Sequence, residues 1–288
     1  MSKALQRFVP DMPMHSETFQ IFHYRDSKPV NTQVHYHDYY EVCCFLSGDI
    51  EYWVEGRTYR LKSGDILLIN PSELHRHIVN KGNQTYERIV LWINKDYIKK
   101  MSGDISLLDC FAGENFDFLR HIKPSPVIRA EMTSRLLELS KEYYTDDFGS
   151  RLCANAIFVR FMIELNRIAL HRKKENATES EQSSIVLKVL DYIGENYYKD
   201  LSLDTLAQKF YVSKYHLSHE FSNSVGTSIH RYILLKRLLA ARQLILNGEN
   251  AGTAAMKCGF KDYTSFFRAF KNEYGISPRM CYGKNGED

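Results

Sequence analysis

The chain has 288 residues, of which 44% are hydrophobic and 25% charged, as in a globular protein of about two domains. The start of the chain shows no apolar signal segment, and no stretch approaches the ~18 apolar residues that span a membrane, so we expect a cytoplasmic protein without a membrane partner. The six cysteines show no Cys-x-x-Cys spacing, which favours reduced thiols; redox sensing by Cys43 and Cys44 is a minor alternative.

Short strands separated by turn residues are predicted from residue 33 to residue 94. Gly, Ser and Pro interrupt runs that are rich in aromatic and β-branched residues. The predicted strands are Tyr39–Leu46, Asp49–Glu55, Arg57–Leu61, Ile66–Ile69 and Tyr86–Asn94. Strands at such close intervals indicate a β-barrel or sandwich, which we place within residues 1–126 together with an N-terminal arm (residues 1–20).

The hydrophobic period changes to three or four residues from Ile128 onward, which predicts two amphipathic helices joined near Asp146–Gly149. We assign residues 127–171 to this helical hairpin. A hairpin beside a barrel either forms a dimer interface or packs as a lid on its own barrel, and the pattern does not separate the two. Residues 172–183 are polar throughout and are predicted to be a linker.

Residues 184–288 contain a first predicted helix-turn-helix. Ser202 and Ser213 are expected to cap two short helices, and Ala207 is small enough to let them approach closely. Leu217 and Phe221 face inward. The opposite face of the second helix, which can enter a major groove, carries Lys214, Tyr215, Ser218 and His219.

The pattern recurs about fifty residues later, beyond a long predicted helix over Ile229–Leu246. Gly259 and Phe260 form the turn, and the helix over Tyr263–Tyr274 points Phe266 and Phe270 inward. Its outer face carries Thr264, Ser265, Arg268 and Lys271, of which Arg268 can pair with guanine or clamp a phosphate. Residues 184–288 hold 14 basic and 10 acidic residues, which suits a polyanion partner but also an ordinary solvated surface.

The C-terminal residues resemble the AraC/XylS family of transcription regulators over roughly residues 184–282. Anchors occur in order across both units, which makes the resemblance specific. They are Leu203, Leu206-Ala207, Ser213, His216-Leu217, Phe221, Gly226, Ser228, Tyr232-Ile233, Arg237, Ala241, Leu244, Gly259-Phe260, Phe266, Arg268, Phe270-Lys271 and Gly275-Ile276-Ser277-Pro278. The resemblance implies a seven-helix domain whose two recognition helices enter successive major grooves, and contact with RNA polymerase during activation.

Three departures from the family pattern affect DNA binding. His219 and Ser222 stand where the family usually has Arg and Lys, which removes cations from the first recognition helix. The approach helix of the second unit is small-residue-rich around Gly252–Ala255, so we expect it to be weakly anchored. The terminal motif reads Pro278-Arg-Met-Cys-Tyr282 and lacks its usual final Arg. We therefore expect modest affinity as a monomer, with a homodimer supplying the rest.

The N-terminal pattern His35-Tyr-His37-x-x-x-Glu41, followed by His75 after Pro71, is similar to the cupin barrel signature, although Glu73 replaces the usual Gly. Alternation along a strand would place these side chains on one face. Three imidazoles and a carboxylate suit a divalent transition metal, with His77 as a second-choice ligand. The same groups also suit a metal-free ligand pocket, or a structural role. The predicted ligand-binding residues are His35, His37, Tyr39, Glu41, Trp53 and His75, and the candidate metal ligands are His35, His37, Glu41 and His75.

These observations predict an α+β protein with two domains: a cupin-like β-barrel with a helical hairpin, then an all-α domain with two helix-turn-helix units. The expected function is a DNA-binding transcription regulator controlled by a small molecule, such as a sugar, with no required cofactor and no catalytic residues. A cupin metalloenzyme of the dioxygenase or isomerase type, with a C-terminal interaction module, is the alternative. No nucleotide-binding or hydrolase motif supports that alternative.

Overall fold

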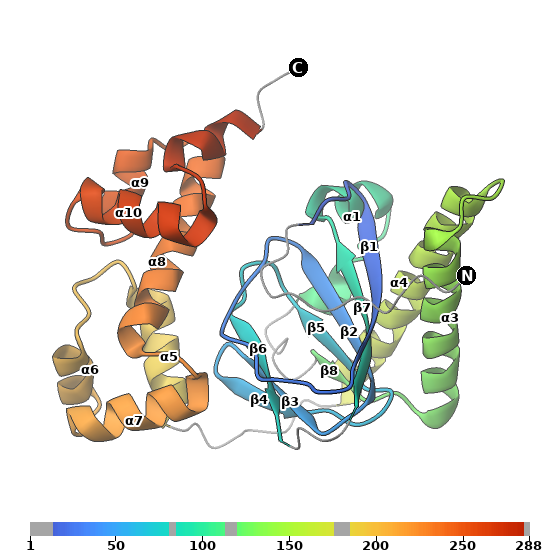
Figure 1. Cartoon of the computed structure of the whole chain (residues 1–288), viewed down its shortest axis with the longest axis horizontal. Coiled ribbons are helices and arrows are strands. Elements are labelled where there is room, and N and C mark those ends of the chain that lie inside the picture. The colour runs from blue at the N-terminus through green and yellow to red at the C-terminus, as the bar shows by residue number, and fades with distance from the viewer. Residues whose placement is uncertain (1–13, 81–84, 113–119, 176–184, 285–288) are drawn as a thin grey trace. The chain divides into compact units, whose positions relative to one another are not determined.

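The computed structural model describes residues 14–80, 85–112, 120–175 and 185–284. The chain divides into two compact units, Met1–Glu181 and Gln182–Asp288. The first unit combines two β-sheets with a helical hairpin, whereas the described part of the second contains helices alone (Figure 1). The predicted α+β class is therefore confirmed. Most of the predicted N-terminal arm, residues 1–13, lies outside the described residues.

Two antiparallel sheets enclose the interior of the first unit. The larger has the strand order β1-β7-β2-β5-β8, and the smaller has the order β4-β3-β6. The strands are β1 (Phe19–Asp26), β2 (Tyr40–Ser47), β3 (Ile50–Val54), β4 (Arg57–Arg60), β5 (Ile66–Ile69), β6 (His75–Val79), β7 (Tyr86–Ile93) and β8 (His121–Ile122). Buried side chains from both sheets form one core, which includes Phe45, Tyr52 and Trp92.

Strand β2 is buried on both faces over its middle residues, which explains its apolar run from Val42 to Leu46. Cys43 belongs to the core between the sheets, and Cys44 belongs to the core on the opposite face. Burial raises the pKa of Cys43 to about 12 and that of Cys44 to about 11, so both stay protonated near neutral pH. Protonated thiols that face opposite ways argue against redox sensing by this pair.

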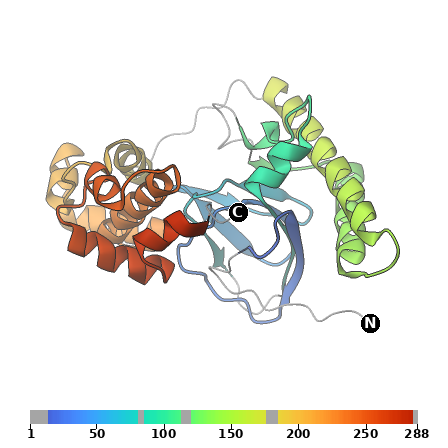
Figure 2. The ribbon, with the colours of Figure 1, turned by 90° about the horizontal axis from the view of Figure 1, so that it is seen from above.

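The helical hairpin covers the outer face of the larger sheet. It consists of α3 (Pro126–Tyr144) and α4 (Ser150–Glu175), which lie side by side (Figures 1 and 2). Leu136 of α3 and Phe158 of α4 are fully buried in the core on this face, together with parts of α1 (Lys95–Met101) and η1 (Asp109–Phe111). Helix α4 extends to Glu175, four residues past the predicted end of the hairpin at residue 171, and residues 176–184 lie outside the described residues.

The carboxylate of Asp65 ties the turn before β5 to β8. It accepts hydrogen bonds from His121 Nε2 at 2.7 Å and from the backbone N–H of Lys62 at 2.9 Å. Burial alone would raise the pKa of Asp65, but these hydrogen bonds outweigh burial and hold that pKa below its ordinary value. The ionised form is thus favoured in the folded state.

We expect Asp65→Asn to destabilise the first unit by about 1.5–3 kcal/mol at neutral pH, as for a lost hydrogen bond to a charged group. Because the folded-state pKa lies below the unfolded value, the stabilisation is complete above about pH 4 and disappears as the pH falls through the folded-state pKa. Urea titrations of both proteins over a series of pH values measure this. A difference that stays constant under acid conditions would refute the role of the ionised carboxylate.

The second unit is built around one long helix, α8 (Ile229–Leu246), whose ends carry two groups of short helices (Figure 1). One group comprises α5 (Ile185–Asn196), α6 (Leu203–Lys209) and α7 (Lys214–Val225). The other comprises α9 (Ala251–Lys257), α10 (Tyr263–Tyr274) and η2 (Pro278–Lys284). The predicted bounds of the helices over Ile229–Leu246 and Tyr263–Tyr274 are confirmed.

Side-chain caps fix where these helices begin. The hydroxyls of Ser202 and Ser213 accept hydrogen bonds from the backbone N–H groups of Thr205 and His216, as predicted. Asn250 caps α9, and Asp262 caps α10. Such caps satisfy backbone donors that the first turn of a helix leaves open, and they give each helix-turn-helix a defined entry into its second helix.

Candidate ligand site and nucleic-acid interface

A cluster of histidines lies inside the first unit, between the segment before β2 and the start of β6. His35 pairs with His75 through two backbone hydrogen bonds, as an isolated bridge beside β6. The segment from His35 to Tyr39 is therefore not the continuous strand that the sequence predicts, and it bends before β2 begins at Tyr40. The side chains converge because of this pairing and not because of strand alternation.

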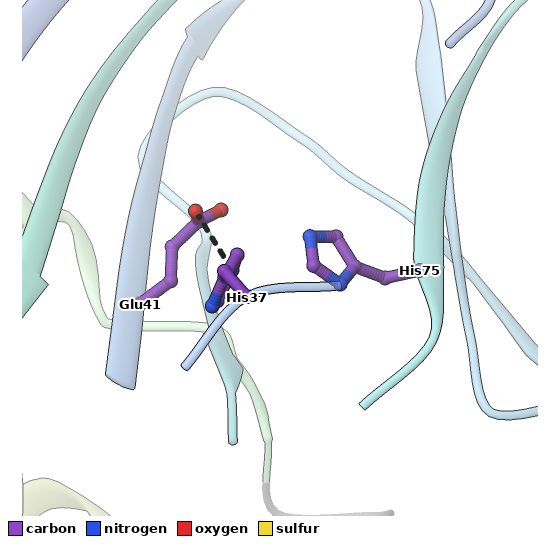
Figure 3. Close-up of side chains that lie close together, drawn as sticks. All are labelled: His37, Glu41 and His75. Carbon is purple, nitrogen blue, oxygen red and sulfur yellow. Dashed lines mark ion pairs between the residues drawn. The ribbon is translucent and has the colours of Figure 1, made fainter. Parts of the chain in front are cut away.

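His37, Glu41 and His75 form the tightest part of the cluster (Figure 3). One ligand atom from each lies within 4.8 Å of the others, and all three side chains are buried. His37 Nε2 lies 3.3 Å from Glu41 Oε2. The ring of His35 lies tilted against that of His75, at 4.3 Å between ring centres, but His35 is not part of this group of ligand atoms. The structure thus brings together three of the four predicted metal ligands.

Backbone carbonyls fix the tautomers of these imidazoles. His37 Nδ1 donates to the carbonyl oxygen of Tyr39, and His75 Nδ1 donates to that of Glu73, both at 2.9 Å. Since a carbonyl oxygen can only accept, the proton of each neutral ring lies on Nδ1 and a lone pair lies on Nε2. His37 Nε2 is buried without a hydrogen-bond partner among the described residues, although Glu41 Oε2 lies close to it.

The surroundings of the site favour an ionised Glu41 and a neutral His75. Burial alone would raise the pKa of Glu41, but contacts from His37, His35 and Trp92 hold that pKa below its ordinary value. Burial, together with His35 and His37, holds the pKa of His75 well below its ordinary value. The indole N–H of Trp92 donates to Glu41 Oε2 at 2.9 Å. A cation, or a ligand that donates hydrogen bonds, fits these lone pairs.

Tyr39 joins the site and Trp53 does not. The ring of Tyr39 stacks on His37 at 4.0 Å. Trp53 pairs with Arg76, whereas its neighbour Tyr52 pairs with His77, so strand alternation directs Trp53 away from the face that carries His77 and His75. The prediction of Trp53 beside the histidines is thus not supported by the register.

His77 has both ring nitrogens engaged. Its Nε2 donates to the carbonyl oxygen of Val30 at 3.0 Å, and Nδ1 lies 3.4 Å from the Thr32 hydroxyl. Burial lowers the pKa of His77 to about 3. We therefore assign His77 a structural role. The sequence prediction missed Trp92. In the structure, Ile89, Leu91 and Ile93 of β7 pack toward the hairpin, and Trp92 faces the core between the sheets.

The first helix-turn-helix of the second unit exposes the predicted DNA-binding face of α7, with its cations compensated. Leu217 and Phe221 are fully buried, whereas Tyr215 is 82% exposed and His219 is exposed. Ser218 is partly buried, and Lys214 forms an ion pair with Asp204 of α6. Glu220 lies 3.8 Å from His219. This face is rich in polar and aromatic groups but poor in uncompensated positive charge.

The second helix-turn-helix exposes the cations of α10. Phe266 and Phe270 are fully buried, and Thr264, Ser265, Arg268 and Lys271 are exposed, as predicted. No ion pair of Arg268 or Lys271 is found within the described residues. The hydroxyl of Ser265 donates to the capping carboxylate of Asp262 at 2.8 Å, so Ser265 first serves the start of the helix. The two recognition helices therefore differ in charge more than in packing.

Comparisons with known proteins match both domains. A family model described as an AraC-like ligand binding domain matches residues 20–157, and one described as a helix-turn-helix domain matches residues 206–281. The HTH-type transcriptional activator RhaS of Escherichia coli O81 (strain ED1a) is 22% identical over 254 residues, or 88% of each chain.

Solved structures also match. The C-terminal domain of AraT, a response regulator from Geobacillus stearothermophilus, is 26% identical, with a TM-score of 0.36 over 38% of this chain and 92% of that one. ToxT from Vibrio cholerae is 15% identical, with a TM-score of 0.37 over 93% of this chain and all of that one. With its ligand-binding and helix-turn-helix domains both matched, the chain belongs to the AraC/XylS family of transcription regulators.

Proposed function

We propose that the chain is a sequence-specific DNA-binding transcription regulator of the cytoplasm, controlled by a small molecule that binds in the N-terminal barrel. The observation that carries this proposal is the presence, in one chain, of an AraC-like ligand-binding domain and a pair of capped helix-turn-helix units. A ligand acts on such a protein by binding one arrangement of it more tightly than another. By family resemblance, activation involves contact with RNA polymerase.

The ligand that we propose presents hydrogen-bond donors to the lone pairs of His37 and His75 and to the Glu41 carboxylate. A polyhydroxylated molecule such as a sugar has this chemistry, and Tyr39 offers an aromatic face beside it. The related RhaS is named as a transcriptional activator, which supports a regulator here in preference to an enzyme.

A divalent transition metal fits the same residues. His37 Nε2 and Glu41 Oε2, 3.3 Å apart, both carry lone pairs when the imidazole is neutral, and such a pair is stabilised by a proton or a metal ion. The residues that would hold a metal are His37, Glu41 and His75, and the ion would supply a positive charge that anchors ligand oxygens. The proposed ligand binding does not depend on a metal. A metalloenzyme is a second candidate only because of this donor set.

A homodimer through the helical hairpin completes the proposal. The inner faces of α3 and α4 pack on the sheet, but α4 also lines an outer groove of about 650 Å³ with apolar Leu152, Val159 and Ile163. Leu152 is 74% exposed. Arg160 and Glu164 flank the groove and pair with each other at 3.3 Å, which gives the groove a polar rim. Exposed apolar surface with a polar rim supports protein association.

Native mass spectrometry of the full chain tests ligand and assembly together. We expect twice the chain mass, and a mass increment after incubation with a panel of monosaccharides or with Zn²⁺. Glu41→Gln should lose the increment. Glu87→Gln should retain it, because Glu87 pairs with His23 on the outer face of the same sheet. Equal increments in wild type and Glu41→Gln would exclude the proposed site, and turnover of a substrate by metal-loaded protein would favour the enzyme.

A further inference from the structure

The turn Pro71–Leu74 forms hydrogen bonds with both histidines of the site, with the backbone of His37 and with the side chain of His75. The backbone N–H of Ser72 donates to the carbonyl oxygen of His37 at 2.7 Å. The carbonyl oxygen of Glu73 accepts the hydrogen bond from His75 Nδ1 at 2.9 Å. The position of this turn therefore decides where the lone pair on His75 Nε2 points.

A buried ion pair holds the turn in place. Arg120 donates from Nη1 and Nη2 to the two carboxylate oxygens of Glu73, at 2.6 and 2.9 Å. The side chain of Arg120 is 2% exposed and that of Glu73 is 16% exposed. The N–H of Asn70 donates to the same carboxylate at 2.7 Å. A bidentate pair of this kind fixes both orientation and distance, because two parallel hydrogen bonds must form together.

The turn needs such support. Ser72 has a φ of +68°, in the left-handed region that residues with a Cβ rarely adopt. A strained backbone of this kind persists only where surrounding contacts hold it. The glutamate that carries the contact is Glu73, which stands where the cupin signature has a glycine, so the chain has replaced a small turn residue with an anchored one.

We propose that Glu73 and Arg120 are positioning residues for the barrel site: they hold the turn so that the Glu73 carbonyl keeps the proton of His75 on Nδ1 and leaves Nε2 open to the ligand. This inference rests on the proposed function in one respect, namely that the ligand binds at His37, Glu41 and His75.

The same pair links the site to the hairpin. Arg120 directly precedes β8, and its carbonyl oxygen accepts the N–H of Leu68 at 2.9 Å. Helix α3 begins at Pro126, a few residues beyond β8. The contact of Arg120 with Glu73 therefore anchors the turn to the segment that leads through β8 into the hairpin.

The tautomer of His75 separates positioning from plain stabilisation. In water, a free histidine side chain favours the proton on Nε2, so loss of the Glu73 contact should return the proton there. Loss of an ion pair that only stabilises the fold would lower the free energy of unfolding without moving this proton.

The test uses the full chain with ¹⁵N-labelled histidine and two-bond ¹H–¹⁵N correlation spectra at about pH 8, where an unpaired imidazole is neutral. His75→Gln assigns the resonances. We expect an Nδ1-protonated ring for His75 in the wild type, and a shift toward the Nε2-protonated form in Glu73→Gln and in Arg120→Lys. Glu164→Gln, which removes a carboxylate paired with Arg135 in the hairpin, should leave the ring unchanged.

Arg120→Lys keeps the charge but not the bidentate contact, so it decides the question if Glu73→Gln fails to fold. A wild-type His75 pattern in a folded Arg120→Lys protein would overturn the proposal, as would an Nε2-protonated ring in the wild type. Because the spectra need no ligand, the absence of any ligand binding would refute the proposed function and leave this result standing.

Discussion

Arg268→Ala is expected to lower the affinity of the full chain for its DNA site about 5- to 150-fold, corresponding to the ~1–3 kcal/mol of one bidentate contact with a base. The guanidinium is exposed on α10, and no carboxylate pairs with it among the described residues. It is therefore available to guanine or phosphate without first breaking an ion pair. His219→Ala should cost less than Arg268→Ala.

The surroundings of His219 explain the lower expectation. Its ring stacks on Tyr215 with 6.0 Å between ring centres, and its Nδ1 accepts a hydrogen bond from the Asn223 amide at 3.1 Å. Glu220 lies nearby. We therefore expect His219 to contribute little to the affinity for DNA, because the Glu220 carboxylate already offsets positive charge on this face. Lys214 is compensated in the same way by Asp204.

Fluorescence anisotropy measures the ranking, with a duplex selected by the wild-type protein from a random pool and with titrations at several salt concentrations. Lys188→Ala is the matched control, since it removes one exposed charge from α5, outside both recognition helices. Its affinity should stay close to that of the wild type. A larger loss for His219→Ala than for Arg268→Ala would show that the first unit dominates recognition.

The helical domain could be predicted closely because its signals are local. A serine that precedes an apolar stripe specifies a cap, and residues spaced by three or four specify the buried face. Ser202 and Ser213 cap as expected, and Phe266 and Phe270 are buried as expected. Charge compensation is different, because the pairing of Lys214 with Asp204 joins two helices through their folded geometry.

The barrel site was predicted in composition but not in geometry. The residues His37, Glu41 and His75 do meet, but through the bridge of His35 to His75, which depends on pairing with a strand forty residues away. Alternation alone suggested one continuous strand, and sequence carries no register between distant segments. Strand β1 escaped prediction for a related reason, because its burial pattern does not alternate cleanly.

Trp53 shows how far the sequence alone could predict which residues line the barrel site. Adjacent residues of a strand face opposite sides, so Tyr52 and Trp53 cannot both line the interior. Strand alternation predicts this from the sequence, but it does not predict which of the two residues faces the histidines. The pairing of Tyr52 with His77 decides it. The contact between Glu73 and Arg120 likewise joins residues 47 positions apart, and no local pattern announces it.

Gly259→Ala is expected to destabilise the second unit by about 2–5 kcal/mol. Gly259 has a φ of +84° in the turn between α9 and α10, and a left-handed residue with a Cβ costs about 1–2 kcal/mol. A Cβ there would also lie 2.5 Å from the carbonyl oxygen of Tyr198 and 2.8 Å from its carbonyl carbon. Because both are backbone atoms, the segment before α6 must shift, and overpacking of this kind costs a further ~1–3 kcal/mol.

Gly275→Ala is the matched control, since Gly275 is also left-handed, at φ +70°, but a Cβ there meets nothing within 4 Å. It should cost only the conformational term. Both tryptophans, Trp53 and Trp92, lie in the first unit, so tryptophan fluorescence follows that unit. Helical circular dichroism on urea titration follows both units, so the part of its transition that the fluorescence does not share reports the second. Fluorescence transitions should coincide for all three proteins.

The first helix-turn-helix explains why the close approach, and not the turn itself, is decisive. Tyr211 occupies the corresponding turn at φ +56° with a full side chain, and it is 94% exposed. A side chain is thus accommodated where the turn opens to solvent, and it is excluded at Gly259, where the turn packs on the backbone of Tyr198. Equal costs for Gly259→Ala and Gly275→Ala would mean that this backbone yields freely, and the second unit would then be softer than its packing implies.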